Sequence, residues 1–248
     1  MNVAHWSWRA SAGAALIASA LGGAGAQEPA LRKITHVIEL FTSQGCSYCP
    51  RADQLVQAIA HEPGIAAVSY PVDYWDYIGW HDTLASPGNT QRQKSYAAGK
   101  EGGQVFTPQI IVDGSVSVAG GDHHALHEAM AGAGLPSNDA DAAITLRHEG
   151  SHFFADIAGG QGGPATVLAL RITPSSTVRI QRGENAGRTV TYTNVVREIN
   201  DLGVWTGGAI SFELPSTANL DDGFIVLLQK GTPEQPGAIL AAAKTAGL

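Results

Sequence analysis

The stretch VIELFTSQGCSYCP, residues 37–50, holds both cysteines of the chain. Five of its first six residues are apolar or β-branched, over the length of a strand, and Ser43-Gln44-Gly45 has the composition of a turn. From Pro50 to Ala60, apolar side chains recur at helical spacing. The stretch therefore predicts a strand that turns into a helix, with both cysteines at the helix N-terminus.

Two cysteines at a helix start favour redox chemistry. The free N–H groups and partial positive charge there stabilise a thiolate, so we expect Cys46 to be the more acidic and reactive thiol. Cys49 can close a disulfide with Cys46 or attack a mixed disulfide formed there. A structural bridge would close too small a loop to constrain the unfolded chain much, and a zinc site would need a second cysteine pair.

Residues 1–26 have the composition of an export signal. Arg9 is their only charge, an apolar run of small residues follows it, and Ala24-Gly25-Ala26 fits a cleavage site. The run is too short to span a membrane. We therefore expect an exported protein, periplasmic or secreted, without a transmembrane segment, in a compartment where disulfides persist.

The charge balance argues against a nucleic acid partner. The chain has 15 basic and 22 acidic residues, and without the predicted signal its net charge changes from −7 to −8. The remainder is long enough for two domains of ordinary size.

The segments after the first helix predict a strand–helix–strand unit. Residues 64–73 form the second strand, which we expect to pair in parallel with the first. Residues 74–82 are dense in aromatic and acidic side chains. We expect them to cap the sheet edge; the alternative is a rim that contacts substrate. Residues 89–98 predict a mostly polar helix.

A hairpin and a helix follow. Two apolar runs meet at Asp113-Gly114, a strong hairpin signal, and Pro108 opens the first run, where proline does not disrupt pairing. Residues 123–133 predict a helix, with Asp122 as its N-cap.

This order of elements, with its two cysteines and its proline, resembles the thioredoxin superfamily. The segments closest to its glutaredoxin branch are GCSYCP at 45–50, TPQIIV at 107–112 and GGD at 120–122. A bacterial exported family, a domain of unknown function with a thioredoxin-like core, is similar at LFTSQGC 40–46, VDYWD 72–76, GW 79–80, RQ 92–93 and TPQ 107–109. The resemblance covers nearly all of the chain after residue 26.

The resemblance implies roles for individual residues. Cys46 would be the nucleophile and Cys49 the resolving thiol. The Thr107-Pro108 bond would be cis and face the cysteines, and Thr107 would pair with the backbone of a bound substrate. Since glutaredoxins hold glutathione near their Gly-Gly segment, Gly121 and Asp122 are further substrate-binding candidates. Pro108 and Tyr48, which stands between the two cysteines, complete the set.

The chain also departs from these patterns. The exported family tends to carry histidine where Pro71 stands. Thioredoxins have tryptophan before the first cysteine and Gly-Pro between the two, where this chain has Gly45 and Ser47-Tyr48. The direction of the redox reaction is therefore left open.

Glu39 is a third catalytic candidate. A carboxylate in the middle of a buried strand is costly unless it is paired or protonated. Glu39 could pair with a basic residue or lie at a sheet edge. Alternatively it could lie near Cys49 and, with a raised pKa, accept the proton of the resolving thiol.

Three histidines raise the question of a metal. Of His123, His124 and His127, the first and last share a helix face, but histidines at a helix start are more often solvated, and we predict no metal site there. Copper is a separate alternative, since two soft thiolates with a histidine select Cu(I).

The second half of the chain has a different pattern. After a linker at 134–140, short strand segments separated by Gly-rich turns predict an antiparallel sandwich. They are residues 143–148, 153–157, 165–172, 177–181, 189–197, 209–214, 224–229 and 239–244. We expect the turn at 182–188 to be a solvated hairpin, and this half shows no catalytic constellation.

The sequence thus predicts a signal peptide at 1–26, an α/β thioredoxin-like domain at 27–135 and an all-β sandwich at 136–248. The predicted activity is thiol–disulfide exchange on protein or small-thiol disulfides, with a redox partner and no bound cofactor. The alternatives are a Cu(I) carrier and a partner-binding module whose disulfide stays closed. Exchange requires Cys46 to be reachable, and a pair sealed beneath the aromatic segment would argue against it.

Overall fold

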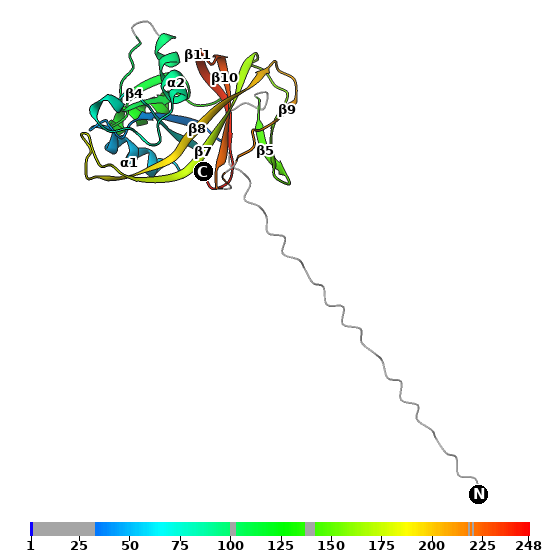
Figure 1. Cartoon of the computed structure of the whole chain (residues 1–248). Helices are drawn as coiled ribbons and strands as arrows, with labels where there is room; N and C mark the ends of the chain where they lie inside the picture. The colour runs from blue at the N-terminus through cyan, green and yellow to red at the C-terminus, as the bar shows by residue number, and fades with distance from the viewer. Residues whose placement is uncertain (2–32, 100–102, 137–141, 218, 220) are drawn as a thin grey trace. The chain divides into compact units, whose positions relative to one another are not determined.

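The computed structural model describes residues 1, 33–99, 103–136, 142–217, 219 and 221–248. Apart from Met1, the predicted signal peptide lies outside these residues. Arg32–Leu248 clusters as one compact unit (Figure 1). In the described part of the chain, no helix has both the length and the apolar character needed to cross a bilayer.

Strand β1, His36–Thr42, lies in the middle of the first half and is buried along nearly its whole length. It pairs in parallel with β2, Ile65–Pro71, and antiparallel with β3, Gln109–Val112. Helix α1, Cys49–Ile59, connects β1 to β2. The predicted strand–helix–strand unit with parallel pairing is therefore confirmed.

Side chains of β1 alternate between two apolar layers, as the period of two requires. Ile38 and Leu40 belong to a cluster with residues of α1 and α3. Val37 and Phe41 belong to a cluster on the other face, which contains Tyr96 and residues of the C-terminal strands. The alternation determines which polar side chains of β1 can approach α1.

The remaining elements of this half follow the predicted order. They are the short helix η1, Asp76–Ile78, helix α2, Pro87–Ala98, strand β4, Val116–Ala119, and helix α3, His123–Gly132. Asp113 and Gly114, with φ of 51° and 72°, make the tight turn between β3 and β4. Asp122 caps α3 by accepting from the Ala125 N–H at 3.0 Å. The hairpin and the N-cap are confirmed.

The fold class predicted from the sequence is wrong. The chain does not form an α/β thioredoxin-like domain followed by a β-sandwich, because one mixed sheet holds strands of both halves, in the order β11-β10-β7-β8-β2-β1-β3-β4. The added strands are β7, Ala165–Arg179, β8, Thr189–Trp205, β10, Gly223–Thr232, and β11, Gln235–Lys244. The protein is mostly β, and its large sheet contains strands from both sides of the predicted domain boundary at residue 136.

The β7–β8 ladder skips one residue pair at the junction of the two halves. The ladder pairs Thr173 with Val195 and Ser175 with Thr193, and it skips Pro174 and Asn194. Pro174 therefore does not end the strand, and the predicted segments 165–172 and 177–181 are one strand. Beside the skipped pair, Ser69 of β2 pairs with Val195, and Asn194 Nδ2 donates to the Ala67 carbonyl of β2 at 2.9 Å.

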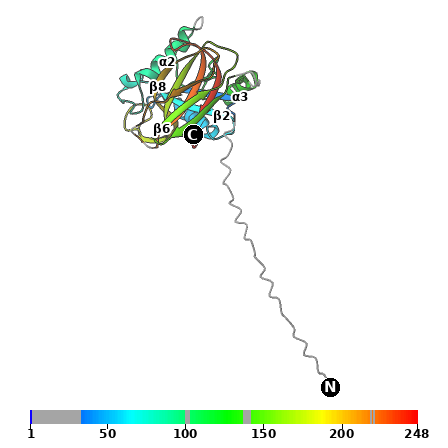
Figure 2. The ribbon, with the colours of Figure 1, turned by 90° about the vertical axis from the view of Figure 1, so that its right-hand side faces the viewer.

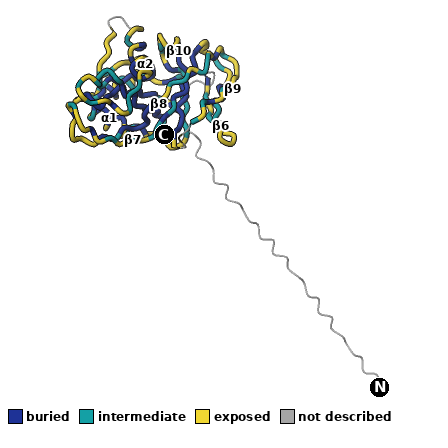
Figure 3. The backbone as a smooth tube through the Cα atoms, in the orientation of Figure 1, coloured by how far each residue is buried: buried dark blue, intermediate teal, exposed yellow. Residues whose placement is uncertain are grey.

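A separate three-stranded sheet has the order β5-β6-β9, with β5 Ile144–Glu149, β6 His152–Ile157 and β9 Ile210–Glu213. It packs on β7 and β10 through an apolar cluster that includes Ile157, Val167 and Phe224. This sheet lies at the β10–β11 end of the unit, whereas α1 lies at the other end (Figures 1 and 2). Buried backbone runs through the strands between them (Figure 3).

Candidate functional site

The two cysteines form a disulfide at the start of α1, with their Cα atoms 5.4 Å apart. Cys49 is the first helical residue, and its N–H donates to the Cys46 carbonyl at 3.2 Å. The N-cap residue, Tyr48, makes no side-chain capping bond, and the first turn holds no acidic residue. The positive end of the helix dipole therefore favours a thiolate at Cys46 once the bridge is reduced.

Pro108 lies against the same helix. The Thr107-Pro108 bond is cis, as the resemblance implied. A Cβ placed on Gly120 would lie 2.9 Å from Pro108 Cβ and 3.1 Å from Ala52 Cβ, so the proline packs next to the turn that follows Cys49. Pairing of β3 with β1 starts at Gln109. The backbone of Thr107 thus stands outside the ladder.

Glu39 is paired with a basic residue, the first of its two predicted alternatives. Arg92 Nε donates to Glu39 Oε1 at 2.7 Å, and the Tyr96 hydroxyl donates to Oε2. Glu39 shares its face of β1 with Val37 and Phe41, opposite the face that packs on α1. Both carboxylate oxygens are satisfied far from the helix, so the geometry gives no support to Glu39 as a proton acceptor for Cys49.

Asp53 is a buried acid that the sequence analysis missed. It follows Cys49 by four residues, one helical turn, on the buried side of α1. Its Oδ1 accepts from Thr42 at 2.7 Å, and its Oδ2 is buried without a hydrogen-bond partner among the described residues. Burial raises the pKa of Asp53 to about 8, against the lowering effect of the Thr42 hydrogen bond. A signal was present, since Asp53 falls on the apolar stripe of the predicted helix.

The aromatic segment 74–82 lies against the turn before Cys46. A Cβ on Gly45 would lie 2.9 Å from Trp75 Cβ, and Trp75 Nε1 donates to Thr107 Oγ1 at 2.7 Å. Trp80 Nε1 donates to Gln44 Oε1, also at 2.7 Å. The segment therefore does more than cap the sheet edge: it is hydrogen-bonded both to the cysteine turn and to the loop that carries Pro108.

The β7–β8 hairpin reaches the same turn from the second half of the chain and lies beside α1 (Figure 1). Asn185 Nδ2 donates to the carbonyls of Gln44 at 2.9 Å and of Cys46 at 2.8 Å. The prediction of a solvated hairpin at 182–188 is wrong for Asn185, which is 1% exposed. This contact could not be predicted from the sequence, because nothing local to residue 185 points to a partner 139 residues away.

Both sulfurs are covered. Cys46 is 1% exposed and Cys49 is fully buried, so the expectation that Cys46 is reachable is wrong for this arrangement. Tyr48, between them, is 81% exposed. The other substrate-binding candidates lie at the start of α3, where Asp122 serves as the helix cap and a Cβ on Gly121 would lie 3.8 Å from Arg51 of α1.

Residues 37–229 match a family described as a protein of unknown function, DUF1223, over more than half of the chain. The chain belongs to this family.

Two solved structures resemble this DUF1223 chain. A crystal structure of a protein from Agrobacterium tumefaciens has a TM-score of 0.74 and 30% identity, and the match covers 88% of this chain and 96% of that one. HBP35 of Porphyromonas gingivalis has a TM-score of 0.58 and 14% identity, with 87% of this chain and 76% of that one covered. At that identity the second likeness shows the fold alone.

A short segment is similar to a protein named "Probable Thioredoxin" from Archaeoglobus fulgidus. The identity is 43% over 37 residues, 15% of this chain. The match spans 41% of that protein's length. This similarity is compatible with a redox role for the DUF1223 chain and leaves its activity open.

The described residues contain no group of three or more His, Cys, Asp or Glu side chains placed to hold a metal ion. His123, His124 and His127 are exposed on α3, and His124 pairs with Glu128 at 3.3 Å.

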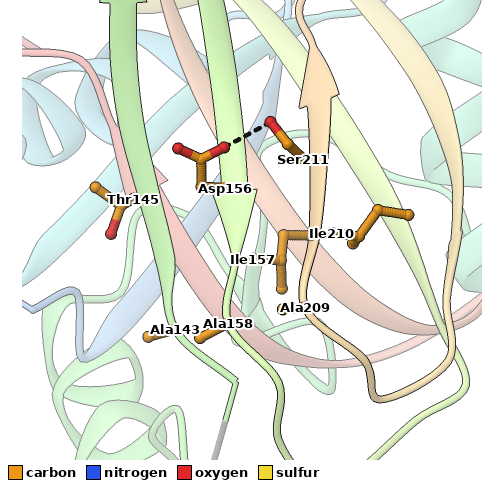
Figure 4. A pocket seen from close by; sticks show the side chains of 8 residues that line it. All are labelled: Ala143, Thr145, Asp156, Ile157, Ala158, Ala209, Ile210 and Ser211. Carbon is orange, nitrogen blue, oxygen red and sulfur yellow. Dashed lines mark hydrogen bonds between the residues drawn. The ribbon is translucent and has the colours of Figure 1, made fainter.

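A shallow pocket of about 480 Å³ lies on the three-stranded sheet, lined by β5, β6 and β9 (Figure 4). Its one charged side chain, Asp156, is already bonded to Ser211 and Arg147. The pocket therefore offers no free reactive group.

Proposed function

We propose that this DUF1223 protein carries out thiol–disulfide exchange, with Cys46 as the attacking thiolate and Cys49 as the resolving thiol. The observation that carries the proposal is the Cys46–Cys49 disulfide at the start of α1, with the buried carboxyl of Asp53 one turn behind it. The positive end of the helix dipole would stabilise the thiolate, and the two thiols are close enough to close and open the bridge.

In the reducing direction, the Cys46 thiolate attacks one sulfur of a substrate disulfide, and the other substrate sulfur leaves as a thiolate. Cys49 then loses its proton and attacks Cys46, which releases the first substrate sulfur and closes the bridge. The substrate gains two electrons, and the Cys46–Cys49 dithiol loses two. A partner dithiol reduces the bridge again by the same exchange, so the chemistry uses no bound cofactor.

Asp53 is the group that would accept the Cys49 proton. Its pKa of about 8 lies near the ordinary thiol value of about 8.5, so the proton can pass between them with a small free-energy difference. Its free Oδ2 provides the acceptor atom. Asp53 thus takes the role that the sequence analysis gave to Glu39.

Substrates would meet the exposed ring of Tyr48 and the backbone of Thr107, which lies outside the β1–β3 ladder beside Pro108. We propose protein or small-thiol disulfides as substrates, in the periplasm or outside the cell, on the strength of the signal-like composition of residues 1–26. Because both sulfurs are covered, exchange requires the segments over Cys46 to move aside first.

The burial of both sulfurs favours a second candidate, a partner-binding module whose disulfide stays closed. The two are separated by equilibrating the oxidised protein with glutathione buffers of graded ratio, then alkylating and counting free thiols by mass. Exchange predicts that both thiols appear together, and that Cys49→Ser accumulates a glutathione adduct at Cys46.

The matched control is Cys46→Ser, in which the buried Cys49 should form no adduct. A bridge that stays oxidised in the folded protein at every glutathione ratio would overturn exchange and leave the closed module. A pair that is inert to exchange but binds Cu(I) after chemical reduction would point to the carrier instead.

A further inference from the structure

The tip of the β7–β8 hairpin, residues 180–188, ends on the cysteine turn. Asn185 Nδ2 contacts the carbonyl oxygens of Gln44 and Cys46, at 2.9 Å and 2.8 Å. Carbonyl oxygens only accept, so both amide hydrogens of Asn185 are used, and the amide cannot be turned over without losing both bonds. This one side chain therefore ties the tip to the residue that would react.

The tip is a preformed unit. The Gly187 N–H donates to the Ile180 carbonyl at 2.8 Å, and the Arg188 N–H donates to the Asn185 carbonyl at 3.1 Å. Ile180 clusters with Trp80 of the aromatic segment. The tip and the aromatic segment therefore lie together beside the cysteine turn.

The attachment through Asn185 is incomplete. Asn185 is 1% exposed, and its Oδ1 has no hydrogen-bond partner among the described residues. A buried acceptor without a partner disfavours the closed arrangement, because water would satisfy it in an open one. Release of the tip exchanges two protein hydrogen bonds for bonds to water, a small net change.

We propose that Asn185 is a positioning residue that latches the hairpin tip over Cys46 and so sets the rate at which thiols reach the disulfide. The proposal rests on the proposed exchange function. An attacking thiolate must contact the Cys46 sulfur, which is covered while the latch is closed. The hairpin tip must therefore open before the disulfide can react, and the opening rate sets the same upper limit on the reduction rate for every attacking thiol.

The test measures how fast the oxidised chain is reduced by increasing dithiothreitol and, separately, by glutathione. For the unmodified protein we expect both rates to level off at one common plateau, the opening rate. Asn185→Ala should raise that plateau about tenfold, the size expected from losing two neutral hydrogen bonds. Asn185→Asp should raise it at least as much, because a carboxylate oxygen would then face a carbonyl.

Glu184→Ala is the matched control, because Glu184 is the exposed neighbour of Asn185 in the same tip. Its plateau should equal that of the unmodified protein. If Asn185→Ala does not fold, Asn185→Ser replaces it: a hydroxyl has one donor instead of two, so its plateau should lie above that of the unmodified protein.

Two outcomes are distinguishable. The latch would be overturned if folded Asn185 variants and the unmodified protein reached the same plateau, or if the rates rose linearly with thiol concentration and reached no plateau. In either case, exchange would still stand as long as glutathione reduces and re-forms the bridge. A disulfide that no thiol reduces, even in Asn185→Ala, would overturn exchange itself.

Discussion

Arg92 Nε lies 2.7 Å from Glu39 Oε1, and both side chains are buried. Arg92 also donates from Nη2 to Gln229 of β10 at 3.0 Å. The pair therefore links β1 and α2 to a strand of the second half of the chain. It accounts for a carboxylate in the middle of a buried strand without giving that carboxylate a part in the chemistry.

Removal of Arg92 should destabilise the fold strongly. Arg92→Leu leaves the Glu39 carboxylate buried without its cation, and the free energy of unfolding should fall by about 3–5 kcal/mol, read from urea midpoints. Glu39→Leu combined with Arg92→Leu should recover most of that loss. As a control, Glu149→Gln removes the exposed partner of Arg147 and should cost no more than about 1 kcal/mol. A loss that small for Arg92→Leu would contradict the buried pair as a stabilising link.

Asp53→Asn should slow resolution. The amide cannot take the Cys49 proton, so the mixed disulfide between Cys46 and glutathione should persist about a hundredfold longer, as measured by acid quench and mass. In the unmodified protein the resolution rate should rise with pH as Asp53 loses its proton near pH 8. In the variant the rate should rise only as the Cys49 thiol itself ionises, so the two pH profiles should differ. Identical pH profiles for the two proteins would remove Asp53 from the mechanism.

The same substitution should raise stability. The folded pKa of Asp53 lies above its unfolded value of about 3.9, so its contribution is fully present below pH 4 and is lost as pH rises toward 8. The advantage of Asp53→Asn in unfolding free energy should therefore grow from pH 5 to pH 8, by up to roughly 1.4 kcal/mol per pH unit. Asp221→Asn, at an exposed carboxylate, is the control and should show no such trend. An advantage that does not change with pH would mean that Asp53 is ionised when buried.

The local elements of the fold were predictable from the sequence, but the assembly of the sheet was not. Apolar runs, turn residues and caps specify β1, α1 and the Asp113-Gly114 turn over a few residues each. Pairing of β8 with β2 joins residues 126 positions apart at Ser69 and Val195. Nothing in either strand indicates that partner. Pro174 suggests a strand end, whereas the ladder skips only the pair at this position and then continues.

The candidate site divides in the same way. The cysteines and Pro108 were found because their types and order carry the chemistry. Glu39 was given a catalytic role because the sequence does not show which face of β1 packs on α1. Asp53 was missed, although it lies on the side of α1 that packs against β1. Asn185 depends on a contact between the two halves of the chain, which is the kind of information that local patterns lack.

Asn194 offers a test of the junction between those halves. Its φ is 49°, in the left-handed region, and its Nδ2 donates to the Ala67 carbonyl of β2. Asn194→Gly loses only the hydrogen bond and should cost about 1 kcal/mol of unfolding free energy. Asn194→Ala also meets the left-handed penalty and should cost about 1 kcal/mol more. At Thr177, an ordinary strand position, the order should reverse, with glycine costing more than alanine. The same order at both positions, read from urea midpoints, would mean that the left-handed backbone conformation of Asn194 does not affect the stability of the junction.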